Sequence, residues 1–207
     1  MIRAIVSDFG GVLTSPLIEG FLTYQERTGV TAEDLGAAMA KARERYGEHP
    51  LFELERGEIS EEEFGTRLGE GLERELDLRH LRDAYFEGLR PNARMIDYMR
   101  GLRERGLRMA LCTNNVREWE PLWRAKLPEL DQIFEIVVDS AFVGMRKPEP
   151  GIYELTVERL GGLRAEECLF VDDIELNCEA ARELGMTAVR FEHSDQAIAE
   201  LESALRQ

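Results

Sequence analysis

The sequence predicts an α/β fold: a doubly wound, Rossmann-like parallel sheet of about five strands, with a helical segment inserted after the first strand. Short apolar runs alternate with longer segments whose apolar residues recur at helical spacing. Residues 15–90 carry helical spacing without any run typical of a strand. Three of the short runs end in polar or acidic side chains, as strands do at the ligand-binding edge of such a sheet.

Five apolar runs are expected to form the strands: residues 2–6, 107–112, 133–138, 168–171 and 187–191. Each is too short for a typical helix and is bounded by polar or turn-forming residues. The first run is followed by Asp8 and then by Gly10 and Gly11, which mark a tight turn. Right-handed crossovers between successive strands would make the sheet parallel and place helices on both faces.

About four helices are expected within residues 15–90. Thr31 with Asp34 begins one of them, and Ser60 followed by Glu63 is a capping box for another. Breaks are expected at residues 47–50 and 56–60. After the insertion, one helix is expected to begin at Pro91 and end near residue 106, and another to pass through residues 119–123. Three more helices are expected at residues 151–160, 175–184 and 196–205, and a loop at residues 142–150. The predicted domains are a core of residues 1–14 and 91–207 and an inserted unit of residues 15–90.

Length and charge limit the classes of protein that the chain can represent. Its 207 residues suffice for one α/β domain, or for a core with a small insertion. The net charge of −15 argues against binding to nucleic acids or to anionic membranes, because both need a basic surface. No apolar run is long enough to span a bilayer, and Arg3 and Asp8 interrupt any signal-peptide stretch. We therefore expect a cytoplasmic protein. Its three cysteines lack the spacing of a zinc site, and we expect them to be buried reduced thiols.

Polar side chains after three predicted strands, with one lysine from the 142–150 loop, form the candidate site: Asp8, Thr113, Asn114, Asp172, Asp173 and Lys147. The carboxyl ends of parallel strands meet at one edge, so these side chains can converge. Three carboxylates clustered there require a cation. Oxygen ligands without nearby histidine or cysteine favour Mg²⁺ over zinc.

These residue types indicate phosphate-ester chemistry on a small-molecule substrate. A carboxylate can attack phosphorus to form an aspartyl-phosphate, which water then hydrolyses. Mg²⁺ would offset the repulsion between the anionic nucleophile and the phosphate. Lys147 would neutralise the same charges from the other side, while the Thr113 hydroxyl and the Asn114 amide would hold phosphoryl oxygens.

Four segments carry these residues: 8–12 (DFGGV), 112–114 (CTN), 143–150 (VGMRKPEP) and 171–173 (VDD). In this order they resemble the motifs of the haloacid dehalogenase superfamily. The similarity is strongest to the N-terminal phosphatase domain of bifunctional soluble epoxide hydrolases and to small bacterial sugar-phosphate phosphatases. The sequence has no Gly-x-Ser-x-Gly elbow, so no epoxide hydrolysis is implied.

The resemblance implies a role for each site residue. Asp8 would be the nucleophile and a Mg²⁺ ligand, the backbone carbonyl of Gly10 another ligand, and Asp172 and Asp173 the remainder of the metal site. Residues 15–90 would form a helical cap that closes over the site and selects the substrate. The expected function is a magnesium-dependent phosphatase that hydrolyses a small phosphorylated metabolite.

One position departs from the family pattern. Family phosphatases usually carry a second aspartate two residues after the nucleophile, where it protonates the leaving oxygen and later activates water; this residue is Gly10 here. Since a general acid–base typically contributes about 10²–10⁴-fold in rate, we expect a preference for phosphate esters with good leaving groups. Four polar residues are either surrogate acids or solvated surface residues: Asn115, Glu118, Glu48 and His49.

Two other functions stay open. The first is a catalytically silent protein that binds a phosphorylated ligand or partner, which Gly10 alone supports. The second is a haloacid dehalogenase. Dehalogenases of this superfamily need no Mg²⁺ and lack the paired acids of residues 172–173, so this pair weighs against that function. The oligomeric state is not predicted.

Four further residues have two interpretations each. Asn177 would either support the acidic pair by hydrogen bonding or be an ordinary polar residue in a first helical turn. Arg146 would either add positive potential beside Lys147 or be a solvated neighbour. Trp119 and Trp123 would either line the cleft between cap and core or serve in ordinary helix packing.

Overall fold

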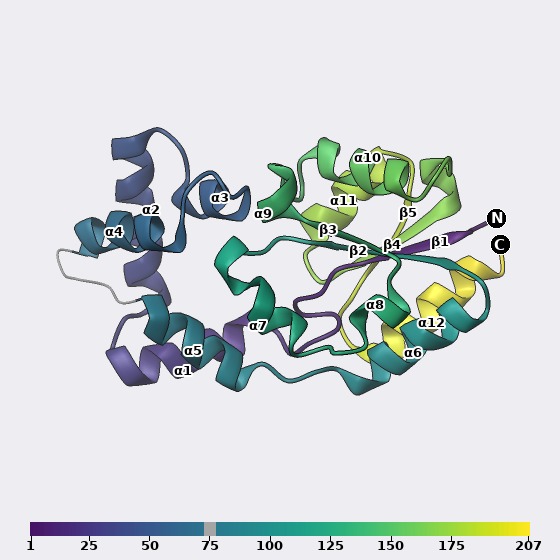
Figure 1. The fold of residues 1–207 in the computed structure, drawn as a ribbon, viewed down its shortest axis with the longest axis horizontal. Coiled ribbons are helices and arrows are strands. Elements are labelled where there is room, and N and C mark those ends of the chain that lie inside the picture. The colour runs from purple at the N-terminus through teal and green to yellow at the C-terminus, as the bar shows by residue number, and fades with distance from the viewer. Residues whose placement is uncertain (73–77) are drawn as a thin grey trace.

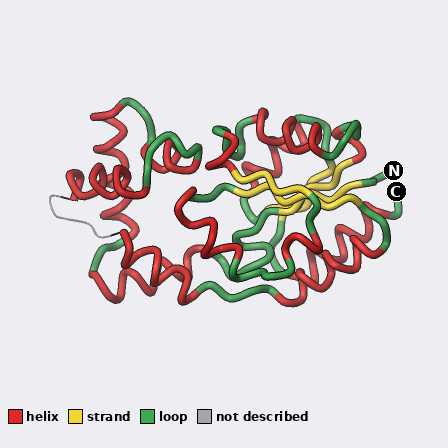
Figure 2. The backbone as a smooth tube through the Cα atoms, viewed as in Figure 1, coloured by secondary structure: helices red, strands yellow, loops and turns green. Residues whose placement is uncertain are grey.

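A computed structural model describes residues 1–72 and 78–207 and shows a five-stranded sheet, drawn in yellow in Figure 2, with helices on both sides. Neighbouring strands are all parallel, and their order is β3-β2-β1-β4-β5. The strands are β1 (Ala4–Ser7), β2 (Arg108–Thr113), β3 (Ile136–Asp139), β4 (Cys168–Asp172) and β5 (Thr187–Arg190). The predicted doubly wound α/β sheet is confirmed.

Among the described residues between β1 and β2, the first five helices lie on the far side of the molecule from the chain termini (Figure 1). They are α1 (Leu17–Thr28), α2 (Ala32–Tyr46), α3 (Pro50–Glu55), α4 (Glu61–Leu72) and α5 (Leu78–Gly88). We call them the helical insertion.

The other helices cover the two faces of the sheet. They are α6 (Ala93–Glu104), α7 (Glu120–Arg124), α8 (Leu130–Ile133), α9 (Ser140–Val143), α10 (Pro150–Arg159), α11 (Glu175–Glu183) and α12 (Ser194–Leu205), with short 3₁₀ turns at Arg117–Trp119 and Ala165–Glu167. Figure 1 shows α6, α8 and α12 on one side of the sheet and α10 and α11 on the other.

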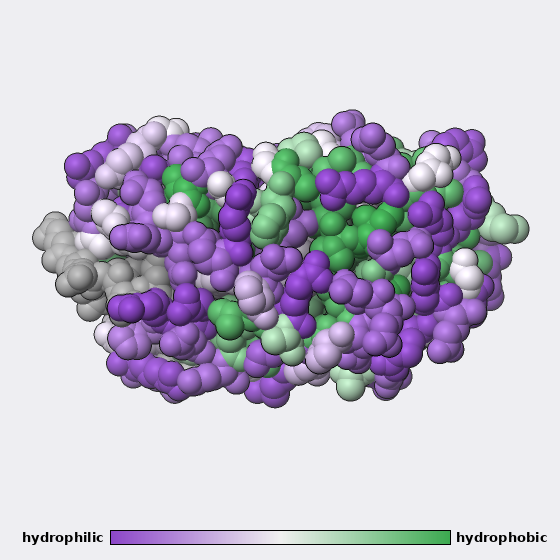
Figure 3. Space-filling model, viewed as in Figure 1, coloured by the Kyte–Doolittle hydropathy of each residue, from purple (hydrophilic) through white to green (hydrophobic). Residues whose placement is uncertain are grey.

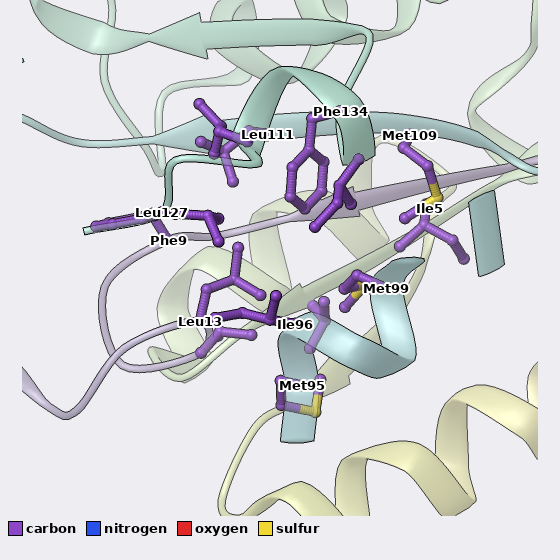
Figure 4. Packing of buried hydrophobic residues seen from close by; sticks show 14 of the residues in the cluster. Ile5, Phe9, Leu13, Met95, Ile96, Met99, Met109, Leu111, Leu127 and Phe134 are labelled. Atoms are coloured by element: carbon purple, nitrogen blue, oxygen red, sulfur yellow. The ribbon is translucent and has the colours of Figure 1, made fainter. Parts of the chain in front are cut away.

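The two faces of the sheet carry separate hydrophobic cores, because consecutive strand residues point to opposite faces. On β1, Ile5 belongs to the core beneath α6 and α12, whereas Ala4 and Val6 belong to the core beneath α10 and α11. Figure 4 shows the first core, in which Ile5 and Phe9 lie among residues of α6 and of the neighbouring strands. Both cores hold β1 at the centre of the sheet, so the residue after it lies in the middle of the carboxyl edge.

A third hydrophobic cluster lies in the helical insertion and includes one residue of the core, Val116. Helix α1 packs against α5, and α2 packs against α4. The buried residues of this cluster are Tyr24, Val30, Leu35, Ala38, Leu54, Phe64, Leu68, Ala84 and Val116. An antiparallel bridge between Thr14 and Pro91 joins the two connections to the core. The predicted inserted unit also includes residues 73–77, which lie outside the described residues, and the division into two domains stays a prediction.

The predicted helix starts within the insertion are confirmed. Thr31 Oγ1 accepts a hydrogen bond from the Asp34 N–H (3.1 Å), and Asp34 Oδ2 accepts one from the Thr31 N–H (2.9 Å). Ser60 Oγ accepts a hydrogen bond from the Glu63 N–H (3.1 Å) in front of α4. These side chains satisfy amide groups that the first helical turn leaves without partners.

Several predicted boundaries in the core are wrong for local reasons. The third strand begins at Ile136 because residues 130–133 form α8. Helix α6 begins at Ala93 rather than at Pro91, because the Asn92 side chain accepts a hydrogen bond from the backbone N–H three residues later (3.4 Å). Residues 119–123 form a 3₁₀ turn followed by α7 rather than one helix.

A short helix also replaces the first part of the loop predicted at residues 142–150. Asp139 Oδ1 accepts a hydrogen bond from the Ala141 N–H (3.0 Å) and so caps α9, which ends at Gly144 with a left-handed φ of 70°. An aspartate is a strong N-cap residue, and glycine adopts this conformation without steric cost.

The state of the cysteines and the character of the surface are as the composition predicts. The three cysteines are free and buried, as predicted, and burial raises the pKa of the Cys112 thiol to about 11. The face of the molecule in Figure 3 is mostly hydrophilic, as expected for a chain with 32% charged residues. None of the helices in the described part of the chain is long and apolar enough to cross a bilayer.

Candidate active site

The carboxyl ends of the three central strands form the candidate active site. Strand β1 lies between β2 and β4, with Ser7 in register with Leu111 on one side and Val171 on the other. Asp8 therefore follows the central strand, while Thr113 ends β2 and Asp172 ends β4. The structure thus brings together the residues expected to converge at this edge.

Lys147 lies between two of the carboxylates. Its Nζ is 2.8 Å from Asp8 Oδ1 and 2.6 Å from Asp172 Oδ2, and the residue is only 1% exposed. Burial alone would lower the pKa of the Lys147 ammonium, but the charges of Asp172 and Asp8 raise this pKa above its usual value. Lys147 is therefore a permanent positive charge inside the site.

Three carboxylates meet beside this lysine. Asp8, Asp172 and Asp173 each place one oxygen within 4.8 Å of the others. Burial raises the pKa of Asp8 to about 7; Asp172 and Asp173 add to the rise, and Lys147 opposes it. Burial and the charge of Asp172 also raise the pKa of Asp173. One ammonium group cannot neutralise three carboxylates, and this all-oxygen donor set fits a hard divalent cation such as Mg²⁺.

Asn177 donates hydrogen bonds to the Asp172 carboxylate. The Asn177 Nδ2 lies 3.0 Å from Oδ1 and 3.1 Å from Oδ2 of Asp172, and Asn177 is buried. The backbone N–H of Ile174 also donates to Asp172 Oδ1 (2.9 Å). Of the two interpretations of Asn177, the structure thus favours hydrogen-bonded support of the acidic pair.

The Asn114 side chain contacts the backbone of Lys147. Its Oδ1 accepts a hydrogen bond from the Lys147 N–H (2.8 Å), and its Nδ2 donates one to the Lys147 carbonyl (2.9 Å). The sequence predicts that this amide holds phosphoryl oxygens, but the observed contacts favour a role in positioning Lys147. Thr113 is buried, and its Oγ1 lies 3.5 Å from the Asn114 carbonyl, which is long for a hydrogen bond.

The two glycines after Asp8 differ in their surroundings. A Cβ on Gly10 would meet no heavy atom within 4 Å, so the position of the missing family aspartate borders open space. Gly11 has a φ of 77°, and a Cβ there would collide with the Asp173 carboxylate. The Gly11 turn therefore admits Asp173 to the site.

The four candidate surrogate acids make local contacts. Glu118 Oε1 accepts a hydrogen bond from the Glu61 N–H at the start of α4 (3.2 Å), and the Asn115 side chain accepts one from the next backbone N–H (3.3 Å). Glu48 accepts a hydrogen bond from the His49 N–H (2.8 Å), and the His49 ring stacks on a phenylalanine of α3, with 4.4 Å between ring centroids. These contacts lend no support to the surrogate-acid hypothesis.

Tyr85 of α5, which was not selected from the sequence, interacts electrostatically with Asp8. Burial raises the pKa of its hydroxyl, and the negative charge of Asp8 contributes to this rise, so Tyr85 lies within electrostatic reach of Asp8. Its ring stacks on Trp119 at 5.7 Å between centroids, and Trp119 Nε1 donates to Glu61 Oε1 (3.0 Å). Trp119 thus lies between core and insertion, whereas Trp123 is 1% exposed and packs in the core. No sequence signal distinguishes Tyr85 from an ordinary apolar helix position.

Comparisons with known proteins agree with this geometry. Residues 2–185 match the family model described as haloacid dehalogenase-like hydrolase. The chain is 26% identical over 217 residues to bifunctional epoxide hydrolase 2 of Rattus norvegicus, which covers 97% of this chain but 38% of that protein. It is 29% identical over 204 residues to D-ribitol-5-phosphate phosphatase of Bacteroides thetaiotaomicron, with 93% of each chain covered.

Solved structures show the same fold. A haloacid dehalogenase family enzyme from Bacteroides thetaiotaomicron, in complex with magnesium and inorganic phosphate, superposes with a TM-score of 0.69. The two sequences are 24% identical, and the alignment covers 92% of this chain and 94% of that enzyme. The curated rat protein is longer, and this chain spans 38% of its length.

Proposed function

Because this chain belongs to the haloacid dehalogenase-like hydrolase family, we propose that it is a magnesium-dependent phosphatase acting on a small phosphorylated metabolite. One observation carries the proposal: Asp8, Lys147, Asp172 and Asp173 meet at the carboxyl edge of the sheet. The D-ribitol-5-phosphate phosphatase, which aligns over most of both chains, supports a phosphate ester as the substrate class.

Asp8 is the proposed nucleophile. One of its oxygens attacks phosphorus, so a bond forms between Asp8 and the phosphoryl group while the bond from phosphorus to the leaving oxygen breaks. Water then hydrolyses the aspartyl-phosphate and regenerates the carboxylate. The Lys147 ammonium, 2.8 Å from Asp8, offsets the negative charge of both partners. The Thr113 hydroxyl at the end of β2 is the candidate donor to a phosphoryl oxygen.

The ionisation of Asp8 requires more positive charge than Lys147 supplies. With a pKa of about 7, Asp8 is partly protonated at neutral pH, and a protonated carboxyl is a poor nucleophile. A Mg²⁺ ion held by Asp8, Asp172, Asp173 and the backbone carbonyl of Gly10 would supply the positive charge that keeps these carboxylates ionised.

Gly10 determines the kind of substrate we expect. It provides no acid for the leaving oxygen, and the side chains of Glu118, Asn115 and Glu48 accept hydrogen bonds from backbone amides. Substrates whose leaving oxygen needs little protonation, such as anomeric sugar phosphates, aryl phosphates and acyl phosphates, should therefore react fastest. The net charge of −15 continues to favour a small molecule over a nucleic acid, and a cytoplasmic location stays a prediction.

Gly10 also supports the second function, a catalytically silent protein that binds a phosphorylated ligand or partner. Such a protein would keep the Thr113 and Lys147 contacts but would not turn a phosphate ester over. The third function, haloacid dehalogenation, remains disfavoured because Asp172 and Asp173 lie together beside Asp8.

Hydrolysis of p-nitrophenyl phosphate tests the proposal. The rate is measured with Mg²⁺ and with a chelator, for the wild type, for Asp8→Asn and for Asp97→Asn, whose carboxylate is exposed on α6. We expect Mg²⁺-dependent turnover that is lost in Asp8→Asn and retained in Asp97→Asn. Metal-independent turnover of a haloacid would instead indicate a dehalogenase, and absence of turnover on a broad phosphate panel with intact ligand binding would indicate the silent protein.

A further inference from the structure

Two ion pairs of opposite polarity join the helical insertion to the segment that carries Lys147. Arg146 Nε, from the core, lies 2.6 Å from Glu55 Oε2 at the end of α3. Arg56 Nη1, from the insertion, lies 2.8 Å from Glu149 Oε1 in front of α10. We call these the crossed ion pairs. They lie where α3 packs beside α9, as Figure 1 shows.

The Arg146–Glu55 pair is largely shielded from water, whereas Glu149 of the second pair is 37% exposed. The side chains of Arg146, Glu55 and Arg56 are 14%, 16% and 16% exposed. The Arg146 guanidinium also lies 4.0 Å from the centroid of the Phe52 ring. Burial raises the pKa of the Glu55 carboxyl, and the charge of Arg146 opposes this rise. Breaking a shielded pair leaves an uncompensated charge, so these contacts hold their partners more firmly than exposed pairs do.

The crossed ion pairs act on the backbone next to Lys147. Arg146 is the preceding residue, and its backbone N–H donates to Glu149 Oε2 (3.1 Å). Glu149 thus contacts Arg56 of the insertion with one oxygen and the Arg146 backbone with the other. Arg146 is therefore linked to the insertion through its side chain and, by way of Glu149, through its backbone.

We propose that Glu55 and Arg56 are positioning residues: through the crossed ion pairs, the docked insertion sets the place of the Lys147 ammonium between Asp8 and Asp172. This inference rests on the proposed phosphatase function and deepens it. It gives the insertion a role in the chemistry itself, in addition to the selection of substrate. Lys147 reaches its working position when the insertion lies against the core, because only then are both ion pairs made.

The test compares Glu55→Gln with a matched control, Glu53→Gln. Glu53 pairs with Arg67 at 2.7 Å, with side-chain exposures of 16% and 12%, so this pair resembles the Arg146–Glu55 pair but lies wholly within the insertion. Since a displacement of about 1 Å near a reacting group costs up to roughly 100-fold in rate, we expect kcat for Glu55→Gln to fall about 10–100-fold. Glu53→Gln should keep kcat within about threefold of the wild type, and both variants should unfold at similar urea concentrations.

Arg146→Gln and the double variant Glu55→Gln/Arg146→Gln complete a cycle. If Glu55 acts through Arg146, the double variant should lose no more activity than the more impaired single variant. Additive losses in kcat would show that Glu55 acts by another route and would overturn the proposal. Equal losses in Glu55→Gln and Glu53→Gln would overturn it as well, since they would reflect the stability of the insertion alone.

Hydrogen exchange of the peptide covering residues 144–150 tests the positioning without turnover. We expect faster exchange in Glu55→Gln than in Glu53→Gln or the wild type, because loss of the Arg146 side-chain contact loosens the segment whose amides donate to Glu149 and Asn114. Unchanged exchange in Glu55→Gln would contradict the proposal. If the wild type hydrolyses no phosphate ester but Glu55→Gln still exchanges faster, the proposed function has failed while the link between insertion and Lys147 holds.

Discussion

Replacing Lys147 by methionine should destabilise the protein most strongly when Mg²⁺ is absent. The substitution removes the ammonium that lies 2.8 Å from Asp8 and 2.6 Å from Asp172 and leaves three carboxylates within 4.8 Å of one another. Loss of one partner from a buried ion pair costs roughly 3–5 kcal/mol in the free energy of unfolding. The cost should be larger at pH 8 than at pH 6. Asp8 has a pKa of about 7 with Lys147 present, so near pH 6 it is already largely protonated and gains less from the ammonium.

Urea denaturation of the wild type and Lys147→Met, with Mg²⁺ and with a chelator, measures this effect. Mg²⁺ should restore more stability to the variant than to the wild type, because the cation takes over the neutralisation of the carboxylates; a ligand at 100 times its Kd stabilises a protein by about 2.7 kcal/mol. Lys126→Met, outside the site, should change the stability by less than about 0.5 kcal/mol. A loss for Lys147→Met that does not depend on Mg²⁺ or pH would refute the reasoning.

Three further predictions follow from individual positions. Gly10→Asp should raise kcat on alkyl phosphates by about 10²-fold or more, because the open space at this position accepts an acid that can protonate the leaving oxygen. The increase should be smaller on p-nitrophenyl phosphate, whose leaving oxygen needs little protonation. An equal change on both substrates in steady-state assays would contradict this. Gly11→Ala should displace Asp173 and so weaken Mg²⁺ binding measured by calorimetry. Gly144 also has a positive φ, but open space surrounds it, so Gly144→Ala should strain its turn without changing Mg²⁺ binding. Burial raises the pKa of Asp139 to about 7, so between about pH 4 and 7 the folded state holds more protons than the unfolded state and loses stability as the pH rises. Asp139→Asn should therefore stabilise the protein by roughly 1–4 kcal/mol at pH 8 and hardly at pH 4. Equal unfolding midpoints of the variant and the wild type at pH 8 would contradict this.

The sequence was sufficient to predict the sheet and the residues at its edge. Each strand is a short apolar run, and the polar side chains that follow β1, β2 and β4 lie together because parallel strands share a carboxyl edge. Lys147 follows no strand, and it was selected as the one lysine of the loop predicted at residues 142–150. The metal and catalytic roles of these residues stay predictions that the experiments above test.

Contacts between distant side chains could not be predicted from the sequence. The Asn114 amide suits a phosphate or a backbone equally well, and only the fold shows that it meets the Lys147 backbone. Glu55 and Arg146 are 91 residues apart, and each is a charged residue among many in a chain with 32% charged residues. Tyr85 follows a helical periodicity that indicates burial but not what it is buried against.

Boundaries failed where a single side chain decides them. Asn92 caps α6 and leaves Pro91 outside the helix, and Asp139 caps α9 in a segment predicted as loop. Both are hydrogen bonds from a neighbouring backbone amide, and the same residue types are also favoured in turns.

Chemical trapping of the phosphorylated carboxylate tests the central claim most directly. Enzyme quenched in acid during turnover with Mg²⁺ is reduced with borohydride, which converts an aspartyl-phosphate to homoserine, and the peptide containing position 8 is examined by mass spectrometry. The account predicts homoserine at position 8, and none when Mg²⁺ is chelated. An unmodified Asp8 during rapid turnover, or reduction at another carboxylate, would contradict it.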